Sequence, residues 1–245
     1  MKNFFIKSVA TLGIATLGLS SFVGTSNEPN QLSEQEKKEG WSLLFDGKTT
    51  NGWHLYNKGK IPMAWIIQNN ELYCKPDTFT VEHGDLVSDK EYQNFDLRFE
   101  WKITVGGNSG VFFNVVEKES NPTAWSTGPE YQLLDTKHDD YEANVKKRAG
   151  CLYGFFPQKN AAVTKPAGEW NESRIKQVNG KIEFYLNGVL TAEQDLTSKD
   201  WKDLVAKSNF KYFSTFGKTV KGRIALQDWS KGIAFKNIKI KELIY

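Results

Sequence analysis

One segment of the sequence gathers several side chains that could bind a ligand or transfer a proton. It runs GPEYQLLDTKHDD over residues 128–140 and contains one of only three histidines in the chain. The first half is typical of a β-strand, in which alternate side chains share a face, so Glu130 and Gln132 project to the same side. If the apolar side faces the core, this pair lines an outer groove, with Asp135 and His138 at its rim. The alternative is a solvated strand followed by an ordinary charged loop.

Glycines and aromatic residues give further reasons to expect a ligand. The glycine-rich stretch 106–110 leads into a strand over 111–116, and glycines let a ligand approach the backbone of a sheet, although a hairpin turn explains the same residues. The chain also has eight tryptophans and nine tyrosines. Aromatic faces can stack on sugar rings while their polar groups bond hydroxyls. We expect most of them in the core, including Trp53, Trp65 and Trp101. The stacking candidates beside polar segments are Trp125, Tyr153 and Trp170.

Other chemistries have little support in the sequence. His54, His83 and His138 are far apart, and no Cys or His pair has metal-ligand spacing, so we predict no cofactor and no protein-bound transition metal. The acidic loop after Asp135 lacks the central glycine of an EF-hand, and a divalent cation such as calcium stays an open alternative. No phosphate-binding loop or nucleophile elbow is present. The net charge of +3 is spread along the chain, which argues against nucleic acid as a partner.

The chain divides into three parts. Residues 1–26 carry two early lysines, an apolar run and small residues, which predicts a signal peptide and a periplasmic or secreted protein. The apolar run is too short for us to expect a membrane span. Residues 27–39 are polar and are expected to form a flexible lead-in, before a single domain over 40–245. Cys74 and Cys151 could form a disulfide or stay as two buried thiols.

The sequence pattern of the domain predicts an all-β fold. Asn-Gly dipeptides at 51–52, 179–180 and 187–188 are typical of tight hairpin turns. Alternating apolar residues between and around them predict an antiparallel meander over 172–195, and further strands over 96–103 and 233–240. The stretch 198–206 has helical spacing. This pattern favours a jelly roll of two antiparallel sheets with one short helix.

A series of motifs, in order along the domain, carries a family resemblance. They are GWSLLFDGK at 40–48 with Gly52-Trp53, GDLV at 84–87, FDL at 95–97 with Glu100-Trp101, NSGVFF at 108–113, GPEYQ at 128–132 and GEWN at 168–171. Together they resemble the 3-keto-disaccharide hydrolase family. The resemblance implies a concanavalin- or laminin-G-like jelly roll that acts on glycosides whose sugar has been oxidised to a ketone at C3. A partner oxidoreductase would make that 3-keto sugar.

The implied chemistry follows from the ketone. A C3 ketone acidifies the proton on C2, so a base can remove it, and the group at C1 can then leave by elimination. Addition of water afterwards would give net hydrolysis. The reaction needs a base near C2 and donors that face the developing negative charge. We expect Glu130 or His138 as the base, with Asp135 orienting His138.

The resemblance also suggests residues that hold the sugar. We expect Asn108, Gln132 and Tyr153 to bond the sugar or stabilise charge, and Arg174 to face the ketone oxygen. The family's C-terminal Leu-Gln-Asp-His-Gly motif appears here as Leu226-Gln227-Asp228 followed by Trp229. A histidine of the groove is therefore replaced, and Trp229 could stack on a sugar or an aglycone.

Two other functions compete with cleavage of a keto-sugar. A non-catalytic carbohydrate-binding sandwich would need the aromatic residues but not Glu130, Asp135 or His138. Ordinary glycoside hydrolysis needs two carboxylates across the glycosidic bond. The residues two and four positions after Glu130 are Gln132 and Leu134, so its strand offers no second acid on that face.

Overall fold

The strands form where the sequence alternates apolar and polar residues. In β10 (Lys181–Leu186), for example, Ile182, Phe184 and Leu186 are buried while the residues between them are more exposed. The computed structural model describes residues 28–76, 80–229 and 231–244. Over this part of the chain, all strand pairs are antiparallel and assemble into two sheets.

The two sheets differ in size. In the described residues, the eight-stranded sheet has the order β11 (Val189–Asp195), β10, β9 (Asn171–Val178), β6 (Phe95–Ile103), β13 (Ile233–Glu242), β4 (Glu71–Cys74) and β3 (Trp65–Gln68), with β1 (Trp41–Leu43) also paired to β13. The five-stranded sheet has the order β2 (Trp53–Leu55), β5 (Leu86–Tyr92), β12 (Gly222–Leu226), β7 (Asn108–Val115) and β8 (Glu130–Leu134). The predicted meander is β9, β10 and β11 in sequence order, with Asn179-Gly180 and Asn187-Gly188 at its turns.

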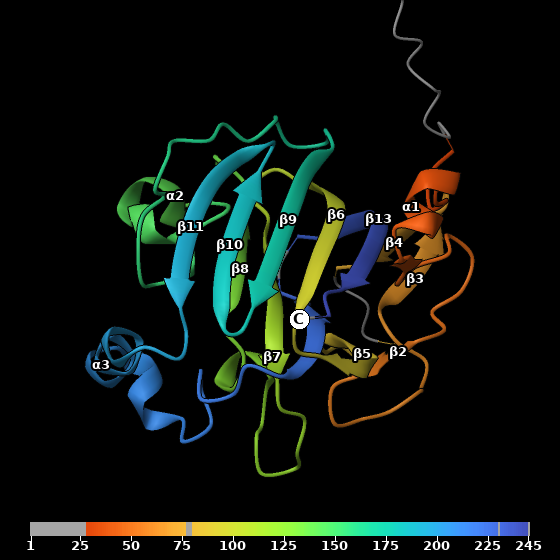
Figure 1. Ribbon diagram of the computed structural model, residues 1–245. Coiled ribbons are helices and arrows are strands. Elements are labelled where there is room, and N and C mark those ends of the chain that lie inside the picture. The colour runs from red at the N-terminus through yellow and green to blue at the C-terminus, as the bar shows by residue number, and fades with distance from the viewer. Residues whose placement is uncertain (1–27, 77–79, 230, 245) are drawn as a thin grey trace, which may run out of the picture.

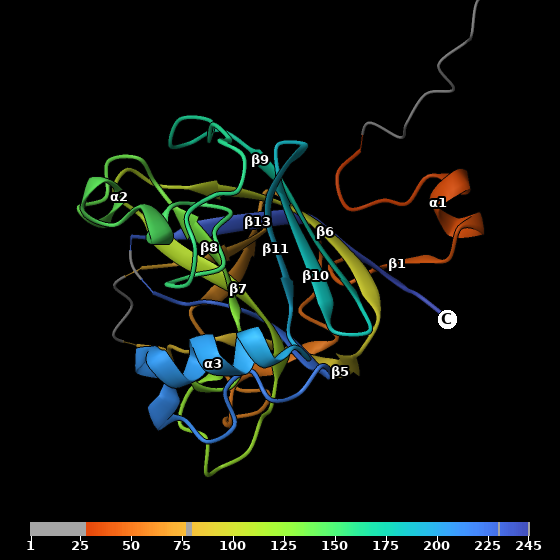
Figure 2. The same cartoon turned by 60° about the vertical axis from the view of Figure 1, so that its left-hand side comes forward.

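The sheets pack face to face, as a jelly roll requires. Figure 1 shows β11, β10, β9 and β6 side by side in the front layer, with β7 and β8 behind them. The turned view in Figure 2 shows β7 and β8 as a separate layer from β10 and β11. The all-β, concanavalin- and laminin-G-like sandwich expected from the sequence is confirmed.

The core between the sheets fixes which face of each strand points inward. Tyr131 of β8 is fully buried, and its hydroxyl lies 2.8 Å from Ser173 Oγ and donates to the Tyr185 carbonyl at 2.9 Å. Ser173 also accepts from Trp101 Nε1 at 2.9 Å. Since Ser173 and Tyr185 belong to the large sheet, Tyr131 spans the core, and its neighbours on β8 must point to the outside. Trp53, Trp65 and Trp101 are buried as predicted.

Helices are short and lie around the sandwich. The α-helices are α1 (Glu34–Lys38), α2 (Asp140–Ala143) and α3 (Lys199–Lys207), and the 3-10 helices are η1 (Ala124–Ser126), η2 (Val145–Lys147) and η3 (Asn209–Tyr212). Helix α3 matches the predicted helix; the Ser198 side chain caps it and Trp201 is its buried residue. None of the helices in the described residues has the length and apolar character needed to cross a bilayer.

The N-terminal part differs from the expected flexible lead-in. Residues 28–39 instead contain helix α1. Ser33 and Glu36 cap its N-terminus with a reciprocal capping box. Asn30 is buried and exchanges backbone-to-side-chain hydrogen bonds with Asn237 of β13. Polar hydrogen bonds to the sheet, which composition does not reveal, therefore order this segment. The predicted signal peptide lies outside the described residues.

The cysteines stay as thiols. Cys74 and Cys151 are both free and buried, which is the second of the two alternatives left open by the sequence.

Candidate active site

Glu130 lies on the outer face of the five-stranded sheet, as the alternation along β8 predicts. Its residue is only 9% exposed, because its carboxyl packs over β7. A Cβ atom built on Gly110 would lie 2.8 Å from both Cγ and Cδ of Glu130 and closer still to Oε1. Gly110 is thus the part of the predicted glycine-rich stretch that matters for the site. It provides the space that the Glu130 carboxyl occupies.

A second carboxyl group lies beside Glu130. Asp85, which immediately precedes β5, accepts the backbone N–H of Asp228 at 3.1 Å. Burial raises the pKa of Asp85 to about 7, and the negative charge of Asp228 adds to this effect. Burial also raises the pKa of Glu130 well above its ordinary range, and the charge of Asp85 raises it further. The charge of each carboxyl group therefore disfavours ionisation of the other.

The raised pKa of Asp85 makes the free energy of unfolding fall as the pH rises. The folded protein keeps the Asp85 proton up to about pH 7, whereas the unfolded chain loses it in the ordinary aspartate range, so the unfolded state binds fewer protons between these limits. Asp85→Asn is expected to flatten the fall in the free energy of unfolding between about pH 4 and 7. Urea unfolding across this range measures the slope. The exposed Glu119→Gln variant is the control, and equal slopes in Asp85→Asn and wild type would contradict the expectation.

Asp228 and His83 also contribute side chains to the site. Asp228 follows β12, and its Oδ2 lies 2.8 Å from Nδ1 of His83. The same Oδ2 accepts the backbone N–H of Gly84 at 3.0 Å. The Asp228 side chain is 8% exposed and that of His83 is 40% exposed. A buried carboxylate thus contacts a histidine that solvent, and hence a ligand, can reach.

Tyr153 is placed near Glu130, as expected. Its backbone N–H donates to the Glu130 carbonyl at 3.1 Å, and burial, together with the charge of Glu130, raises the pKa of its hydroxyl. The ammonium group of Lys147 lies 5.9 Å from the centre of the Tyr153 ring and donates to Asp140 at 3.0 Å. The site therefore contains a cation next to a phenol.

Gln132 and Asn108, both expected to bond a sugar, contact each other. Gln132 Nε2 donates to Asn108 Oδ1 at 2.9 Å. Gln132 is 1% exposed, and among the described residues its Oε1 atom has no hydrogen-bond donor. A buried acceptor without a donor is costly. A sugar hydroxyl would satisfy it.

Asp135 and His138 do not act on each other through their side chains. The Asp135 carboxylate accepts the backbone N–H groups of Gly106 at 2.6 Å and Lys137 at 3.1 Å. The Nδ1 atom of His138 accepts the backbone N–H of Asp140 at 3.0 Å. The backbone N–H of His138 donates to the Asp135 carbonyl at 3.1 Å. Asp135 therefore shapes the turn after β8, and nothing in these contacts supports its expected role in orienting His138.

The two tryptophans on this side of the protein have different surroundings. Trp125 packs edge-on against Phe213, with ring centres 4.8 Å apart, and covers a small apolar cluster on the outer face of the sheet. Trp229 is 65% exposed and directly follows Asp228. Trp229 is therefore the better placed of the two to stack on a ligand.

Arg174 and Trp170 lie on the opposite side of the protein. Arg174 follows the inward-pointing Ser173 on β9, so it projects from the outer face of the large sheet, where it makes two hydrogen bonds to Asp96 at 2.7 and 2.8 Å. The ring of Trp170 is covered there by Lys102 and Lys236. The core separates both residues from Glu130, so the expectation that they serve the same sugar is wrong. The sequence of one strand cannot say to which sheet that strand belongs.

A cavity of about 420 Å³ opens on this opposite face. Its polar lining includes Arg98, Glu100, Glu172, Arg174, Tyr185 and Lys239. Most of these charges are neutralised locally, since Arg174 pairs with Asp96, Glu100 with Lys236 and Lys239 with Glu36. We therefore place the candidate active site on the five-stranded sheet, where the carboxyl groups have raised pKa values.

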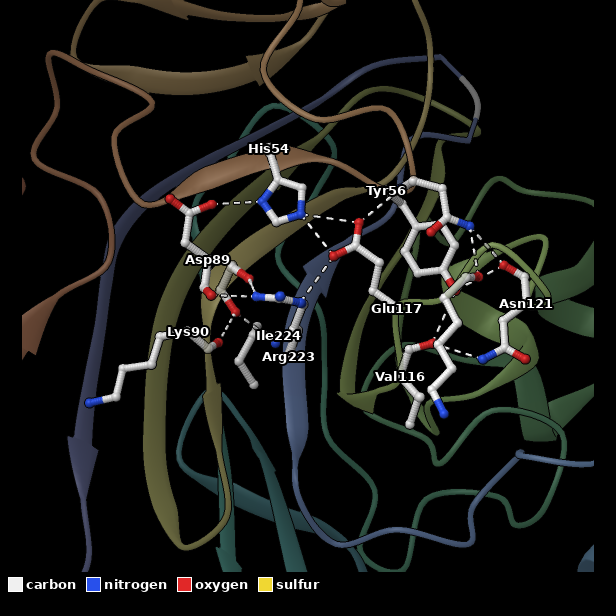
Figure 3. Close-up of polar contacts among 12 residues, drawn as sticks. His54, Tyr56, Asp89, Lys90, Val116, Glu117, Asn121, Arg223 and Ile224 are labelled. Atoms are coloured by element: carbon white, nitrogen blue, oxygen red, sulfur yellow. Dashed lines mark hydrogen bonds and ion pairs between the residues drawn. The ribbon is translucent and has the colours of Figure 1, made fainter.

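A separate ionic network supports the five-stranded sheet away from Glu130 (Figure 3). His54 of β2 lies between two carboxylates, with Nδ1 2.6 Å from Asp89 and Nε2 2.9 Å from Glu117. Glu117 also accepts from Arg223 Nε at 3.0 Å and from the backbone N–H of Asn57 at 2.8 Å. The network thus anchors the start of the loop between β7 and β8, which continues to Glu130.

We expect this network to stabilise the fold. Glu117→Gln removes the charge that His54 and Arg223 share in a region where the side chains are only 14% exposed. The loss in free energy of unfolding is expected to be about 1–3 kcal/mol, because glutamine lacks the charge and keeps only one of the two acceptor oxygens. The matched control is Glu82→Gln, whose partner Lys58 is also exposed, and it should leave stability nearly unchanged. Urea unfolding measures both free energies. Equal losses in the two variants would contradict a stabilising role of the network.

Metal ligands are not grouped in the described part of the chain. No set of three or more His, Cys, Asp or Glu side chains there is arranged to hold a metal ion.

Sequence reasoning missed three residues of this site, namely His83, Asp85 and Asp228. Asp85 was within the motif GDLV, and Asp228 within Leu226-Gln227-Asp228, but neither segment by itself indicates a contact with Glu130. His83 and Asp228 are 145 residues apart in the chain. The two motifs that contain Asp85 and Asp228 were the only indication in the sequence that these residues could be functional.

Comparisons with known proteins agree with these motifs. The family model described as a 3-keto-alpha-glucoside-1,2-lyase-like domain matches residues 40–241. A Bacteroides thetaiotaomicron protein named 3-keto-disaccharide hydrolase is 32% identical over 232 residues, which cover 84% of this chain and 79% of that protein.

Solved structures show the same relationship. A candidate glycosyl hydrolase from Parabacteroides distasonis has a TM-score of 0.80 and 33% identity, covering 89% of this chain and 100% of that chain. A second candidate glycosyl hydrolase from the same species has a TM-score of 0.65 and 26% identity, covering 83% of this chain and 99% of that chain. The shared motifs, the family match and the common fold together show that the chain belongs to the 3-keto-disaccharide hydrolase family, with a 3-keto-alpha-glucoside-1,2-lyase-like domain.

Proposed function

We propose that this protein cleaves the glycosidic bond of 3-keto-glycosides, with Glu130 as the base that removes the C2 proton. The observation that carries the proposal is the Glu130 carboxyl, which is 9% exposed and packed over Gly110 and whose pKa is raised by burial and by the charge of Asp85. A carboxylate with a raised pKa is a stronger base than an ordinary one. A carbon-bound proton made acidic by a neighbouring ketone suits such a base.

The site also supplies donors for the charge that develops on the C3 oxygen. When the C2 proton leaves, the electron pair of its bond forms an enolate with the ketone. The Tyr153 hydroxyl and the nearby Lys147 ammonium could stabilise this oxygen, because fixed donors are most effective where charge develops in a poorly solvated site. Lys147 thereby takes the role that the sequence suggested for Arg174, which the fold places on the far sheet.

Sugar binding is proposed for the polar pair and the exposed aromatic residue. Gln132 Oε1 would accept a sugar hydroxyl, while Asn108 holds the Gln132 amide in place. Trp229, 65% exposed, offers a flat apolar face for a sugar or an aglycone. Family membership and the name of the Bacteroides relative support an oxidised disaccharide as substrate. An oxidoreductase would have to supply the ketone, and we place the reaction in the periplasm or outside the cell.

The carboxyl pair also favours one competing function. The strand of Glu130 offers no second acid, but Asp85, the residue before β5, lies close enough for its charge to raise the pKa of Glu130. Two carboxyl groups are what ordinary glycoside hydrolysis requires. This second candidate would cleave an unoxidised glycoside.

Product analysis separates these functions. The full chain is mixed with 3-keto-trehalose and with trehalose, and the products are identified by mass spectrometry. Cleavage of the keto-sugar alone supports the proposal, and an unsaturated product identifies elimination. Cleavage of unmodified trehalose at a similar rate would transfer support to the carboxylate-pair hydrolase. Binding of either sugar without cleavage would indicate a carbohydrate-binding protein.

A further inference from the structure

The contact between His83 and Asp228 has no role in the proposed proton abstraction. Nδ1 of His83 is 2.8 Å from Asp228 Oδ2. A carboxylate can only accept hydrogen bonds, so Nδ1 carries the proton in this contact. The opposite edge of the ring is then the one that can exchange a proton with a ligand. A histidine oriented in this way by a carboxylate is a common arrangement for general acid–base catalysis.

The protein holds this pair in a fixed position. Gly84 donates its N–H to Asp228 at 3.0 Å, and its carbonyl accepts from the indole of the buried Trp65 at 2.9 Å. On either side, the carbonyl of Glu82 accepts from Ala64 and the carbonyl of Asp85 accepts from Tyr56. The backbone around His83 is thus anchored at four successive peptide groups. Such preorganisation keeps a catalytic group in its productive orientation.

The contact between His83 and Asp228 is linked to the proposed base through Asp85. Asp85 is two residues after His83, and Asp228 donates its backbone N–H to Asp85 at 3.1 Å. Asp85 in turn lies close enough to Glu130 for its charge to raise the pKa of that group. The exposed Trp229 follows Asp228 directly. His83 is therefore joined through Asp228 to the segment that carries the exposed aromatic residue.

The three histidines of the chain differ in what they can do. Both ring nitrogens of His54 face carboxylates, and its side chain is 14% exposed. Nδ1 of His138 accepts a backbone N–H, so that nitrogen carries no proton to donate in this arrangement. His83 combines a carboxylate partner with a side chain that is 40% exposed. Burial raises the pKa of Cys74, and the neighbouring Asp228 raises it further, so this thiol adds no charge beside Asp228.

We infer that His83, oriented by Asp228, is the general acid that protonates the glycosidic oxygen as it leaves C1. This inference rests on the proposed function. Glu130 takes the C2 proton, and the enolate electrons then restore the C3 carbonyl and form the C1–C2 double bond. The C1–O bond breaks, its electron pair stays on the leaving oxygen, and that oxygen takes the proton from His83. For net hydrolysis, water adds its oxygen to C1 and returns one proton to His83, while Glu130 returns a proton to C2.

The test compares two substrates that differ in their need for an acid. An alcohol must be protonated as it leaves, as in 3-keto-trehalose, whereas 4-nitrophenolate leaves readily from 4-nitrophenyl 3-keto-glucoside without a proton. His83→Gln is expected to lower kcat on 3-keto-trehalose by about 100-fold or more, but to change kcat on the aryl substrate by less than about 3-fold. Asp228→Asn should show the same selectivity with a smaller loss, because Asp228 orients the acid without touching the substrate.

Exchange of the C2 proton separates this inference from the proposed function. In D₂O, wild type and His83→Gln should both incorporate deuterium at C2, since Glu130 is intact. The neighbouring exposed Glu82→Gln variant should behave as wild type on both substrates. Equal losses on the two substrates would show that His83 is only structural, and no loss on either would remove it from the reaction. If wild type neither exchanges C2 nor cleaves either substrate, the proposed function itself fails.

Discussion

Replacing Glu130 by glutamine is expected to lower kcat on a 3-keto-glycoside by roughly 100- to 10,000-fold, the usual contribution of a positioned base. Glutamine keeps the shape of the side chain over Gly110 but cannot accept the C2 proton. The KM value should change little, because the groups proposed to bind the sugar are untouched. Stability near neutral pH should not fall, since burial already disfavours the charge that the substitution removes.

Two readouts make this prediction specific. Steady-state kinetics gives kcat and KM, and NMR in D₂O follows exchange of the C2 proton, which should stop in Glu130→Gln but continue in the exposed Glu119→Gln control. Unfolding curves establish that the variant is folded. A folded Glu130→Gln protein that still exchanges C2 at the wild-type rate would exclude Glu130 as the base.

The rise of kcat/KM with pH tests the coupling between Glu130 and Asp85. The base must be ionised, so kcat/KM should rise with pH through the pKa of Glu130. The charge of Asp85 is one of the two causes that raise this pKa, the larger being burial. Asp85→Asn removes that charge and should therefore move the rise to lower pH. An unmoved profile would show that the two carboxyl groups are not coupled.

Replacing Gly110 by alanine is the second change with a large expected effect. The new methyl group would lie 2.8 Å from Cγ and Cδ of Glu130, so the carboxyl must leave its position. Displacement of a catalytic group by about 1 Å can lower the rate by about 100-fold, and we expect a loss of that size in kcat. Overpacking of a filled site should also lower the free energy of unfolding by about 1–3 kcal/mol.

A double-mutant cycle assigns this effect to the contact itself. Gly110→Ala, Glu130→Ala and the double variant are compared in urea unfolding. Because Glu130→Ala removes the atoms that the new methyl group would meet, the stability loss from Gly110→Ala should largely disappear in its presence. The expected coupling energy is about 0.5–3 kcal/mol. Additive losses would mean that Gly110 serves the backbone of β7 and not the carboxyl of Glu130.

Local sequence determined much of the fold. The meander of β9, β10 and β11 could be predicted because each turn is an Asn-Gly pair and each strand alternates apolar with polar residues. Both properties depend only on near neighbours in the chain. The same alternation placed Glu130 and Gln132 on one outward face and Tyr131 in the core. The motifs identified the family, and hence the chemistry to look for.

Only the tertiary structure determined which side chains from distant parts of the chain are neighbours in space. Alternation shows that Arg174 points outward, but only the strand order places it behind the core from Glu130. Likewise, His83 and Asp85 meet Asp228 because β12 lies beside β5 in the sheet, although 145 residues separate His83 from Asp228. The pKa of a carboxyl depends on burial by such distant segments. Side-chain direction is set by neighbours in sequence, whereas the environment that makes a carboxyl a base is set by neighbours in space.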